Sequence, residues 1–206
     1  DMYALSFYNL GYCYFKQQEY DMALNRFRQY TDVEQNHAAA SYADAYNRIG
    51  DCLFHNRQFA AAEENYNKAS QVLPSAGDYS VYQKGFVLGL QKDYNGKIQA
   101  MDQLIREYPE SQYIDDALFE KGRTYVLLEN SSSAIQTFNK LIGEYPESSL
   151  ARKAGVQLGL IYYNDNQPEK AAEAYKQVIS KYPGSEEAKV ALQDLKSVYI
   201  DLNDID

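Results

Sequence analysis

The sequence predicts an all-α fold made of about five helical hairpins in series, followed by a terminal helix. The pentapeptide EYPES occurs at 107–111 and again at 144–148, and the similar KYPGS stands at 181–185, so the motif recurs every 37 residues. Glycines recur at nearly the same interval, at Gly11, Gly50, Gly85, Gly122 and Gly159. Apolar residues within each interval follow the period of a helix. A unit repeated at such an interval is the signature of a solenoid.

Each repeat reads as two helices, A and B, joined by a short turn. In the fourth repeat, Ala134, Phe138 and Leu141 share one helix face. Ahead of them, a second helical pattern runs from Ala117 to Tyr125, with Gly122 where a neighbouring helix must come close. The units are about 4–40, 41–76, 77–110, 111–147 and 148–184, and the terminal helix is 185–203.

The YPxS segments are predicted to separate the hairpins. Proline cannot continue a helix and pushes the preceding residue out of the α region, so helix B should end near Tyr108, Tyr145 and Tyr182. The serine that follows is a candidate N-cap for the next helix A. These serines are Ser111, Ser148 and Ser185.

The pattern resembles the tetratricopeptide repeat. Repeat one carries it as Phe7, Leu10, Gly11, Tyr14, Ala23 and Phe27, and repeat five as Leu158, Gly159, Tyr162, Ala171, Tyr175 and Pro183. Most units exceed the usual 34 residues, Lys97 replaces the small Ala of repeat three, and Gly155 replaces a bulky residue. The longer YPxS form looks most like envelope proteins of Gram-negative bacteria, such as the lipoprotein of the barrel-assembly machinery and the periplasmic partner of Tol–Pal.

The resemblance implies a right-handed superhelical solenoid whose A helices line a concave groove. Among the residues at the family's groove positions, counted from the repeat glycine, eleven are candidate partner-binding residues. They are Tyr8, Tyr12, Phe15, Asn47, Asp51, Phe54, Tyr82, Phe86, Phe119, Arg123 and Tyr163. Such an aromatic set suits an extended or helical peptide, although aromatic residues at helical spacing also form cores.

The expected function is a non-catalytic scaffold for a protein or peptide partner, in assembly or bridging of periplasmic or outer-membrane complexes. A glycan- or lipid-binding envelope domain is the alternative, and a cytoplasmic location stays open. The absence of Trp favours peptides over sugars. Chaperone-tail binding is disfavoured, because the Lys/Asn carboxylate cradle of that subtype is missing apart from Arg123, Arg48 and Arg152.

Charge and composition argue against other classes. The net charge is −9 without a Lys/Arg cluster, which disfavours nucleic acid, since phosphate contacts dominate that affinity. No run of 18 apolar residues predicts a membrane span. Neither an enzyme nor a cofactor is expected, and Cys52-Leu-Phe-His55 lacks the second pair that a zinc site needs. Cys13 and Cys52 occupy equivalent positions and are predicted to be free, buried thiols.

The end of the chain suggests continuation. The terminal helix presents Leu192, Val198 and Ile200 where a solenoid needs a polar cap, and residues 204–206 fall at an A-to-B turn. We therefore expect the chain to be part of a longer array or to precede another domain. Residues 201–206 hint at a calcium loop, but the glycine and late glutamate are missing, which favours a solvated segment.

Overall fold

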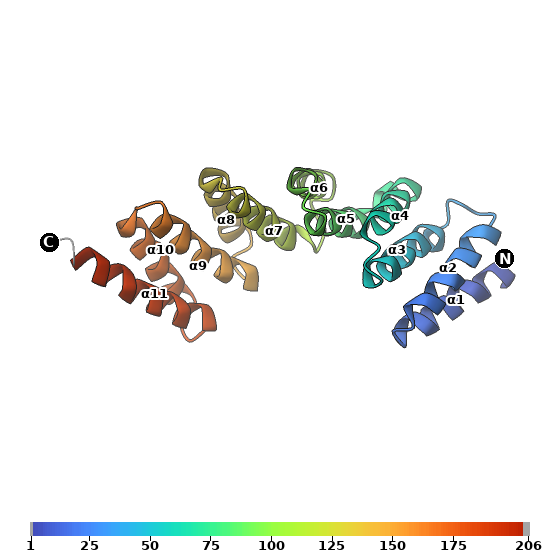
Figure 1. Ribbon diagram of the computed structural model, residues 1–206, viewed down its shortest axis with the longest axis horizontal. Coiled ribbons are helices and arrows are strands. Elements are labelled where there is room, and N and C mark those ends of the chain that lie inside the picture. The colour runs from blue at the N-terminus through green and yellow to red at the C-terminus, as the bar shows by residue number, and fades with distance from the viewer. Residues whose placement is uncertain (1, 204–206) are drawn as a thin grey trace. The chain divides into compact units, whose positions relative to one another are not determined.

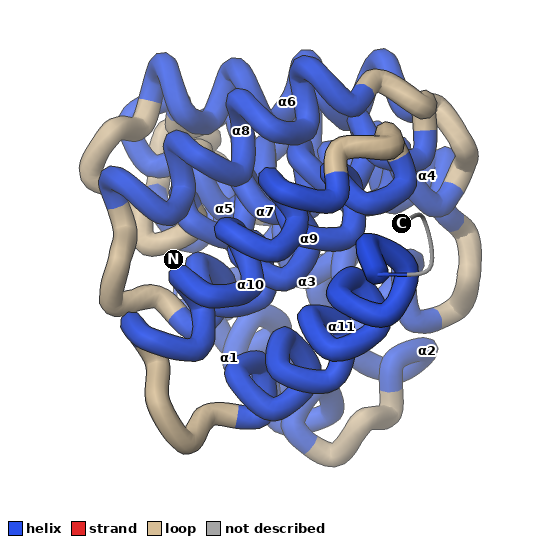
Figure 2. The backbone as a smooth tube through the Cα atoms, turned by 90° about the vertical axis from the view of Figure 1, so that its left-hand side faces the viewer, coloured by secondary structure: helices blue, strands red, loops and turns tan. Residues whose placement is uncertain are grey.

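A computed structural model describes residues 2–203 of the chain, and all regular secondary structure within that range is helical. Eleven α-helices and one 3-10 helix are joined by short turns, and the described residues contain no strand (Figure 2). The predicted all-α fold is therefore confirmed. The chain forms two compact units, one ending at Tyr113 and the other beginning at Ile114.

Unit 1 contains three helical hairpins (Figure 1). The first pairs α1 (Met2–Lys16) with α2 (Tyr20–Val33), and the second pairs α3 (Ala40–His55) with α4 (Phe59–Val72). The 3-10 helix η1 (Pro74–Ala76) leads into the third hairpin, α5 (Asp78–Leu90) with α6 (Tyr94–Glu107). Odd-numbered helices are the predicted A helices.

Unit 2 contains two hairpins and the terminal helix. Helix α7 (Ile114–Leu127) pairs with α8 (Ser131–Glu144), and α9 (Ser149–Asn164) pairs with α10 (Pro168–Lys181). Helix α11 (Glu186–Asn203) packs against α10. The B helices α4, α6, α8 and α10 end shortly before Pro74, Pro109, Pro146 and Pro183, which supply local stop signals.

One contact recurs in every hairpin: the repeat glycine of helix A lies against a large side chain of helix B. A Cβ atom added to Gly50 would come within 2.7 Å of the Tyr66 ring, and one added to Gly159 within 2.3 Å of the Tyr175 ring. The facing side chains are Phe27, Tyr66, Met101, Phe138 and Tyr175, all buried. The absent side chain therefore sets how closely the two helices approach.

The YPxS segments end α6, α8 and α10 as predicted. Tyr108 has φ −129° and ψ 61°, and Tyr145 and Tyr182 adopt nearly the same conformation, outside the α region. Ser148 is the N-cap of α9 and accepts a hydrogen bond from the Leu150 amide. The predicted stop-and-restart role of EYPES is thus confirmed.

The same segments also tie each hairpin to the one before it. The Tyr108 hydroxyl donates to the Pro74 carbonyl at 2.8 Å, and the Ser111 hydroxyl donates to the Asp78 carboxylate at 2.7 Å. In unit 2, the Ser148 hydroxyl donates to Asp115 at 2.6 Å. The Tyr182 hydroxyl donates to the Pro146 carbonyl at 3.0 Å. The motif is therefore a link between repeats as well as a helix terminator.

Every turn from helix A to helix B contains a residue other than glycine in the left-handed conformation. Their φ values lie between 54° and 64°. The residues are Gln18, Arg57, Lys92, Glu129 and Asn166. A residue in this conformation is a common terminator of a helix, but the conformation is strained for any residue that carries a Cβ atom.

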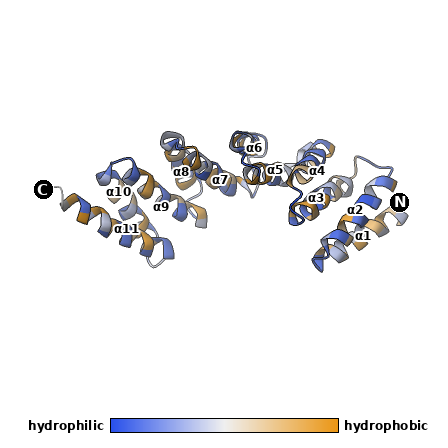
Figure 3. Cartoon of the chain, viewed as in Figure 1, coloured by the Kyte–Doolittle hydropathy of each residue, from blue (hydrophilic) through white to orange (hydrophobic). Residues whose placement is uncertain are grey.

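Each helix carries apolar and polar residues along its length (Figure 3), and the apolar ones face neighbouring helices. Two predictions about burial are wrong. Cys13 is exposed, because no other described helix covers its side of α1, while Cys52 is buried as predicted. Val198 is buried in the contact with α10, whereas Leu192 and Ile200 are exposed as predicted. The suggested turn at 204–206, which is also the second half of the calcium-loop segment, lies outside the described residues.

Candidate partner-binding site

The A helices of unit 1 place one arginine between two carboxylates. Asp44, Arg48 and Asp51 lie on one face of α3, since their spacing of four and three residues matches the helical turn. Arg48 Nη1 lies 2.6 Å from Asp51 Oδ2, and Arg48 Nε lies 3.5 Å from Asp44 Oδ1. The side chain of Arg48 is 18% exposed, and the two carboxylates neutralise its charge within the protein.

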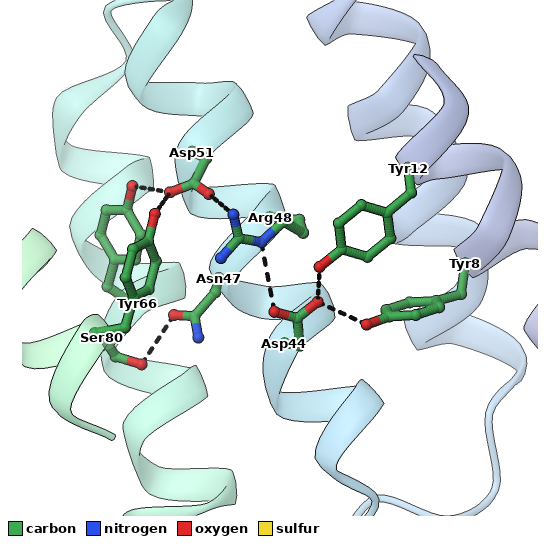
Figure 4. Close-up of polar contacts among 9 residues, drawn as sticks. Tyr8, Tyr12, Asp44, Asn47, Arg48, Asp51, Tyr66 and Ser80 are labelled. Atoms are coloured by element: carbon green, nitrogen blue, oxygen red, sulfur yellow. Dashed lines mark hydrogen bonds and ion pairs between the residues drawn. The ribbon is translucent and has the colours of Figure 1, made fainter. Parts of the chain in front are cut away.

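Tyrosines from neighbouring helices hold both carboxylates (Figure 4). The hydroxyls of Tyr8 and Tyr12, one turn apart on α1, both donate to Asp44 Oδ2. On the other side, Tyr66 and Tyr79 donate to Asp51 Oδ1 at 2.7 and 2.8 Å. The network therefore links four helices, α1, α3, α4 and α5, through charge-assisted hydrogen bonds.

Burial and the carboxylates shift the pKa values in this network. Burial raises the pKa of Asp51, and the Arg48 guanidinium opposes that rise. Burial and the bond to Asp44 raise the pKa of Tyr12 to about 12, and they raise that of Tyr8 further. Burial alone would lower the pKa of Arg48, but the two aspartates raise it, so Arg48 stays charged. One cation between two carboxylates leaves an excess of negative charge.

Aromatic rings continue this surface along the A helices. Arg48 lies 4.9 Å from the ring centre of Tyr79 and 5.8 Å from that of Phe15, within the range of cation–π contacts. The rings of Phe54 and Phe86 lie 6.0 Å apart, and Tyr82 stacks on Tyr113 at 5.2 Å. We call the half-buried set the A-helix surface of unit 1. It comprises Tyr8, Tyr12, Phe15, Asp44, Arg48, Phe54, Tyr82 and Phe86.

Two residues predicted to line the binding groove, Asn47 and Asp51, have buried side chains. Asn47 is 8% exposed and its Oδ1 accepts a hydrogen bond from Ser80 of α5 at 2.8 Å. Asp51 is 6% exposed and is occupied by Arg48 and two tyrosines. Both side chains therefore join α3 to its neighbours and support the A-helix surface from beneath.

Three predicted site residues lie in unit 2, two on α7 and one on α9. Phe119 is half-buried against Phe138, with ring centres 5.9 Å apart. Arg123 is exposed and pairs with Glu120 at 3.2 Å. Tyr163 is exposed, and its hydroxyl donates to Asp201 of α11.

The structure adds Asp44 and Tyr79 to the candidates and gives Arg48 a different role. Arg48 is bound by two aspartates of its own helix, so it is not a free carboxylate cradle. Asp44, Arg48 and Asp51 share a helix face in the sequence, and that spacing was the available signal. The contribution of Tyr79 depends on the packing of α5 against α3 and α4, which spacing alone does not reveal.

Residues 2–203 contain no group of three or more His, Cys, Asp or Glu side chains placed to hold a metal ion. None of the helices formed by these residues has the length and apolarity needed to cross a bilayer.

Family models match the chain over most of its length. A tetratricopeptide repeat model matches residues 6–75, and a second one matches 79–111, 116–148 and 153–185. The chain belongs to the tetratricopeptide repeat family. The matched segments contain the repeat glycines and the YPxS motifs, so this family assignment rests on the residues that define the hairpins.

Solved structures of tetratricopeptide repeat proteins share the fold. A Parabacteroides merdae member aligns with a TM-score of 0.76 at 14% identity, covering 98% of this chain and 75% of that one. MamA from Desulfovibrio magneticus aligns with a TM-score of 0.71 at 18% identity, covering 89% and 97%. YrrB, described as having an unusual peptide-binding site, aligns with a TM-score of 0.67 at 19% identity, covering 92% of each chain. No curated protein matches the sequence.

Proposed function

We propose that this tetratricopeptide repeat protein is a non-catalytic scaffold whose A-helix surface in unit 1 binds a peptide segment of a partner protein. Aromatic side chains dominate binding hot spots because they bury a large area at low entropic cost. The rings of Tyr12, Phe15, Phe54 and Phe86 are half-buried, so part of each is available to a ligand. The peptide-binding site ascribed to YrrB is consistent with this use of the fold.

The single observation that carries the proposal is the fixed Asp44–Arg48–Asp51 arrangement among these rings. Four tyrosine hydroxyls and the guanidinium hold it in place, so little further ordering is needed when a ligand binds. Because the arginine is already neutralised, the surface favours a basic or uncharged peptide over an acidic one.

Selection from a displayed library of random dodecapeptides, with the intact chain as bait, tests the proposal. We expect enrichment of peptides that combine Lys or Arg with an apolar residue. Their affinity should fall in the Tyr12→Ala/Phe86→Ala double variant, whose helicity is checked by circular dichroism. Peptides that bind the double variant equally well would contradict this site.

Two further measurements separate the alternatives. A glycan array and lipid vesicles, probed with the same protein, should show no binding that depends on Tyr12 and Phe86. Binding of either that competes with the selected peptides would favour the glycan or lipid reading. The predicted residues of unit 2, Phe119, Arg123 and Tyr163, are tested by single alanine variants in the peptide assay.

We also propose a place in the bacterial cell envelope, where the protein would assist assembly or bridging of periplasmic or outer-membrane complexes. The support is the YPxS form of the repeat, which resembles that of envelope proteins. Fractionation of cells that express the full-length gene should place the protein with periplasmic or outer-membrane markers. Recovery with cytosolic markers alone would exclude this role.

A further inference from the structure

A second surface of the chain, separate from the A-helix surface, has a hollow of about 300 Å³ in unit 2. It lies between α8 and α10, over the first half of α9. Ile142 contributes from α8, Gly155 and Leu158 from α9, and Val178 and Lys181 from α10. Most of the lining is apolar, and Val178 fills the space beside Gly155, where an added Cβ atom would lie 2.5 Å from Val178 Cγ2.

The equivalent hollow in unit 1 has a different character. When the repeats are aligned on Gly85 and Gly159, Lys84 stands in the place of Leu158 and Glu107 in the place of Lys181. Both hollows share a Gln and the Tyr of the YPxS motif. The repeat fold therefore permits a polar lining with an acid at this position, so the fold by itself does not dictate the cation of unit 2.

Lys181 lies at the rim of the unit 2 hollow, next to a tyrosine ring that is held in place. Tyr182 is fixed by its hydrogen bond to the Pro146 carbonyl, and Lys181 Nζ lies 5.5 Å from the centre of the Tyr182 ring. Lys181 is exposed and is the basic residue among those that line the hollow. An apolar floor with one cation at its edge is complementary to an apolar group that carries a nearby carboxylate.

The polar groups beside Lys181 distinguish a peptide from a fatty acid. The Ser180 hydroxyl donates its proton to the Gln177 carbonyl at 3.1 Å, so towards a ligand it acts as an acceptor. A peptide supplies N–H donors that can meet this acceptor, whereas a fatty acid carboxylate has none. The Gln177 side-chain amide donates to Glu173 at 3.2 Å, so its carbonyl oxygen is a second acceptor on this edge of α10.

We propose that this hollow, the α9 pocket, is a docking site for an acidic peptide segment in which a Phe or Leu side chain is followed by Asp or Glu. The apolar side chain enters the hollow against Leu158 and Val178, and the carboxylate pairs with Lys181. This preference is opposite in charge to that of the A-helix surface, so the two sites recognise different segments.

An NMR titration of the intact ¹⁵N-labelled protein with the peptide Gly-Ser-Phe-Glu-Gly tests the proposal and detects weak binding. We expect the amide signals of Gly155, Ser180 and Lys181 to shift. Lys181→Glu should weaken binding by about tenfold or more, since it replaces attraction by repulsion. The peptide Gly-Ser-Phe-Lys-Gly should bind correspondingly less well.

The chain supplies a matched control. Glu107→Lys makes the same kind of charge reversal at the equivalent position of unit 1 and should leave the titration unchanged, as should Tyr12→Ala/Phe86→Ala. Absence of shifts at Gly155 would overturn the proposal, as would equal affinity of Lys181→Glu and the parent protein. Stronger shifts of the same amides by laurate than by the peptide would also overturn it, in favour of a lipid ligand.

Discussion

Gly122 of α7 lies directly against the ring of Phe138 of α8: a Cβ atom on Gly122 would come within 2.5 Å of Phe138 Cε1. Phe138 is fully buried, so the ring has no space into which it can retreat. The same pairing recurs in the other four hairpins, where the partner of the glycine is an aromatic residue or Met101. Loss of this close approach should therefore disturb the hairpin itself.

Replacement of Gly122 should destabilise unit 2. We expect Gly122→Leu to lower the free energy of unfolding by ~1–3 kcal/mol, because the added side chain overpacks the contact between α7 and α8. Urea denaturation followed by circular dichroism measures the change. Gly143 is the matched control, since it is helical and exposed with no atom near its absent Cβ. Gly143→Ala should stabilise by about 0.5–1 kcal/mol, and equal losses in both variants would refute the packing argument.

The two thiols should differ in reactivity. Cys13 is exposed, whereas Cys52 is fully buried and burial raises the pKa of its thiol to about 12. The thiolate is the reactive form, so both the burial of Cys52 and its raised pKa lower its reactivity. An aromatic disulfide reagent should label one thiol per native chain rapidly and the second only after unfolding. Cys13→Ser should remove the rapid phase, and a rapid phase that persists would contradict the assigned burial.

Replacement of a left-handed residue between helices A and B by glycine should raise the stability of the folded protein. Lys92 has φ 64°, and Lys92→Gly should stabilise unit 1 by about 0.5–1 kcal/mol, since glycine adopts this conformation without a steric cost. The preceding residue, Gln91, has φ −77° and serves as the control. Gln91→Gly should bring no gain in thermal stability. Similar melting temperatures for the two variants would show that strain at Lys92 is negligible.

Removal of Arg48 should expose the cost of the buried carboxylates. Arg48→Met leaves Asp51 without its cation and should destabilise unit 1 by roughly 3–5 kcal/mol at neutral pH. In the Arg48→Met/Asp51→Asn variant, much of the loss should be recovered. Chemical denaturation of all three proteins at pH 7 measures both effects. If the double variant recovers no stability, the loss comes from the packing of the aliphatic part of Arg48 and not from the unpaired carboxylate.

The pH dependence of the Arg48→Met defect follows from the sign of the Asp51 shift. Burial raises the pKa of Asp51 above its ordinary value of 3.8, so the folded state holds this proton more tightly than the unfolded state. The stabilisation from that proton is complete below pH ~3.8 and is lost as the pH rises through the folded pKa. Removal of Arg48 strengthens this effect, so the deficit relative to the parent should shrink as the pH falls from 7 towards 4. A deficit that grows on acidification would contradict this account.

The hydrogen bonds of the YPxS motif should contribute to the cohesion of neighbouring repeats. Ser148→Ala removes both the N-cap of α9 and the bond to Asp115 of α7. A double-mutant cycle with Asp115→Ala separates the inter-repeat part, which we expect to be about 0.5–1.5 kcal/mol. An interaction energy near zero would reduce the serine to a cap alone.

Much of the fold could be predicted from the sequence because its signals are local. The proline that follows the last tyrosine of helix B, the serine caps and the glycine–aromatic spacing are short-range signals that repeat in register. The αL turns were not predicted, since Gln18, Arg57, Lys92 and Glu129 are poor candidates for that conformation from their residue types. Cys13 was predicted to be buried because it is equivalent in sequence to Cys52. Among the described residues, no neighbouring helix covers that side of α1, so the equivalence does not hold for burial.

The sequence by itself determined the repeat, its helical hairpins and the family, since these depend on short-range steric and capping rules that act at every copy of the motif. Only the tertiary structure decided which side chains meet across hairpins. It placed Asn47 and Asp51 in the interior, joined Tyr8 and Tyr12 to Asp44, and gave the α9 pocket its lone cation. The physical reason is that hydrogen bonds and burial between helices depend on how consecutive hairpins pack, and spacing along the chain does not specify that packing.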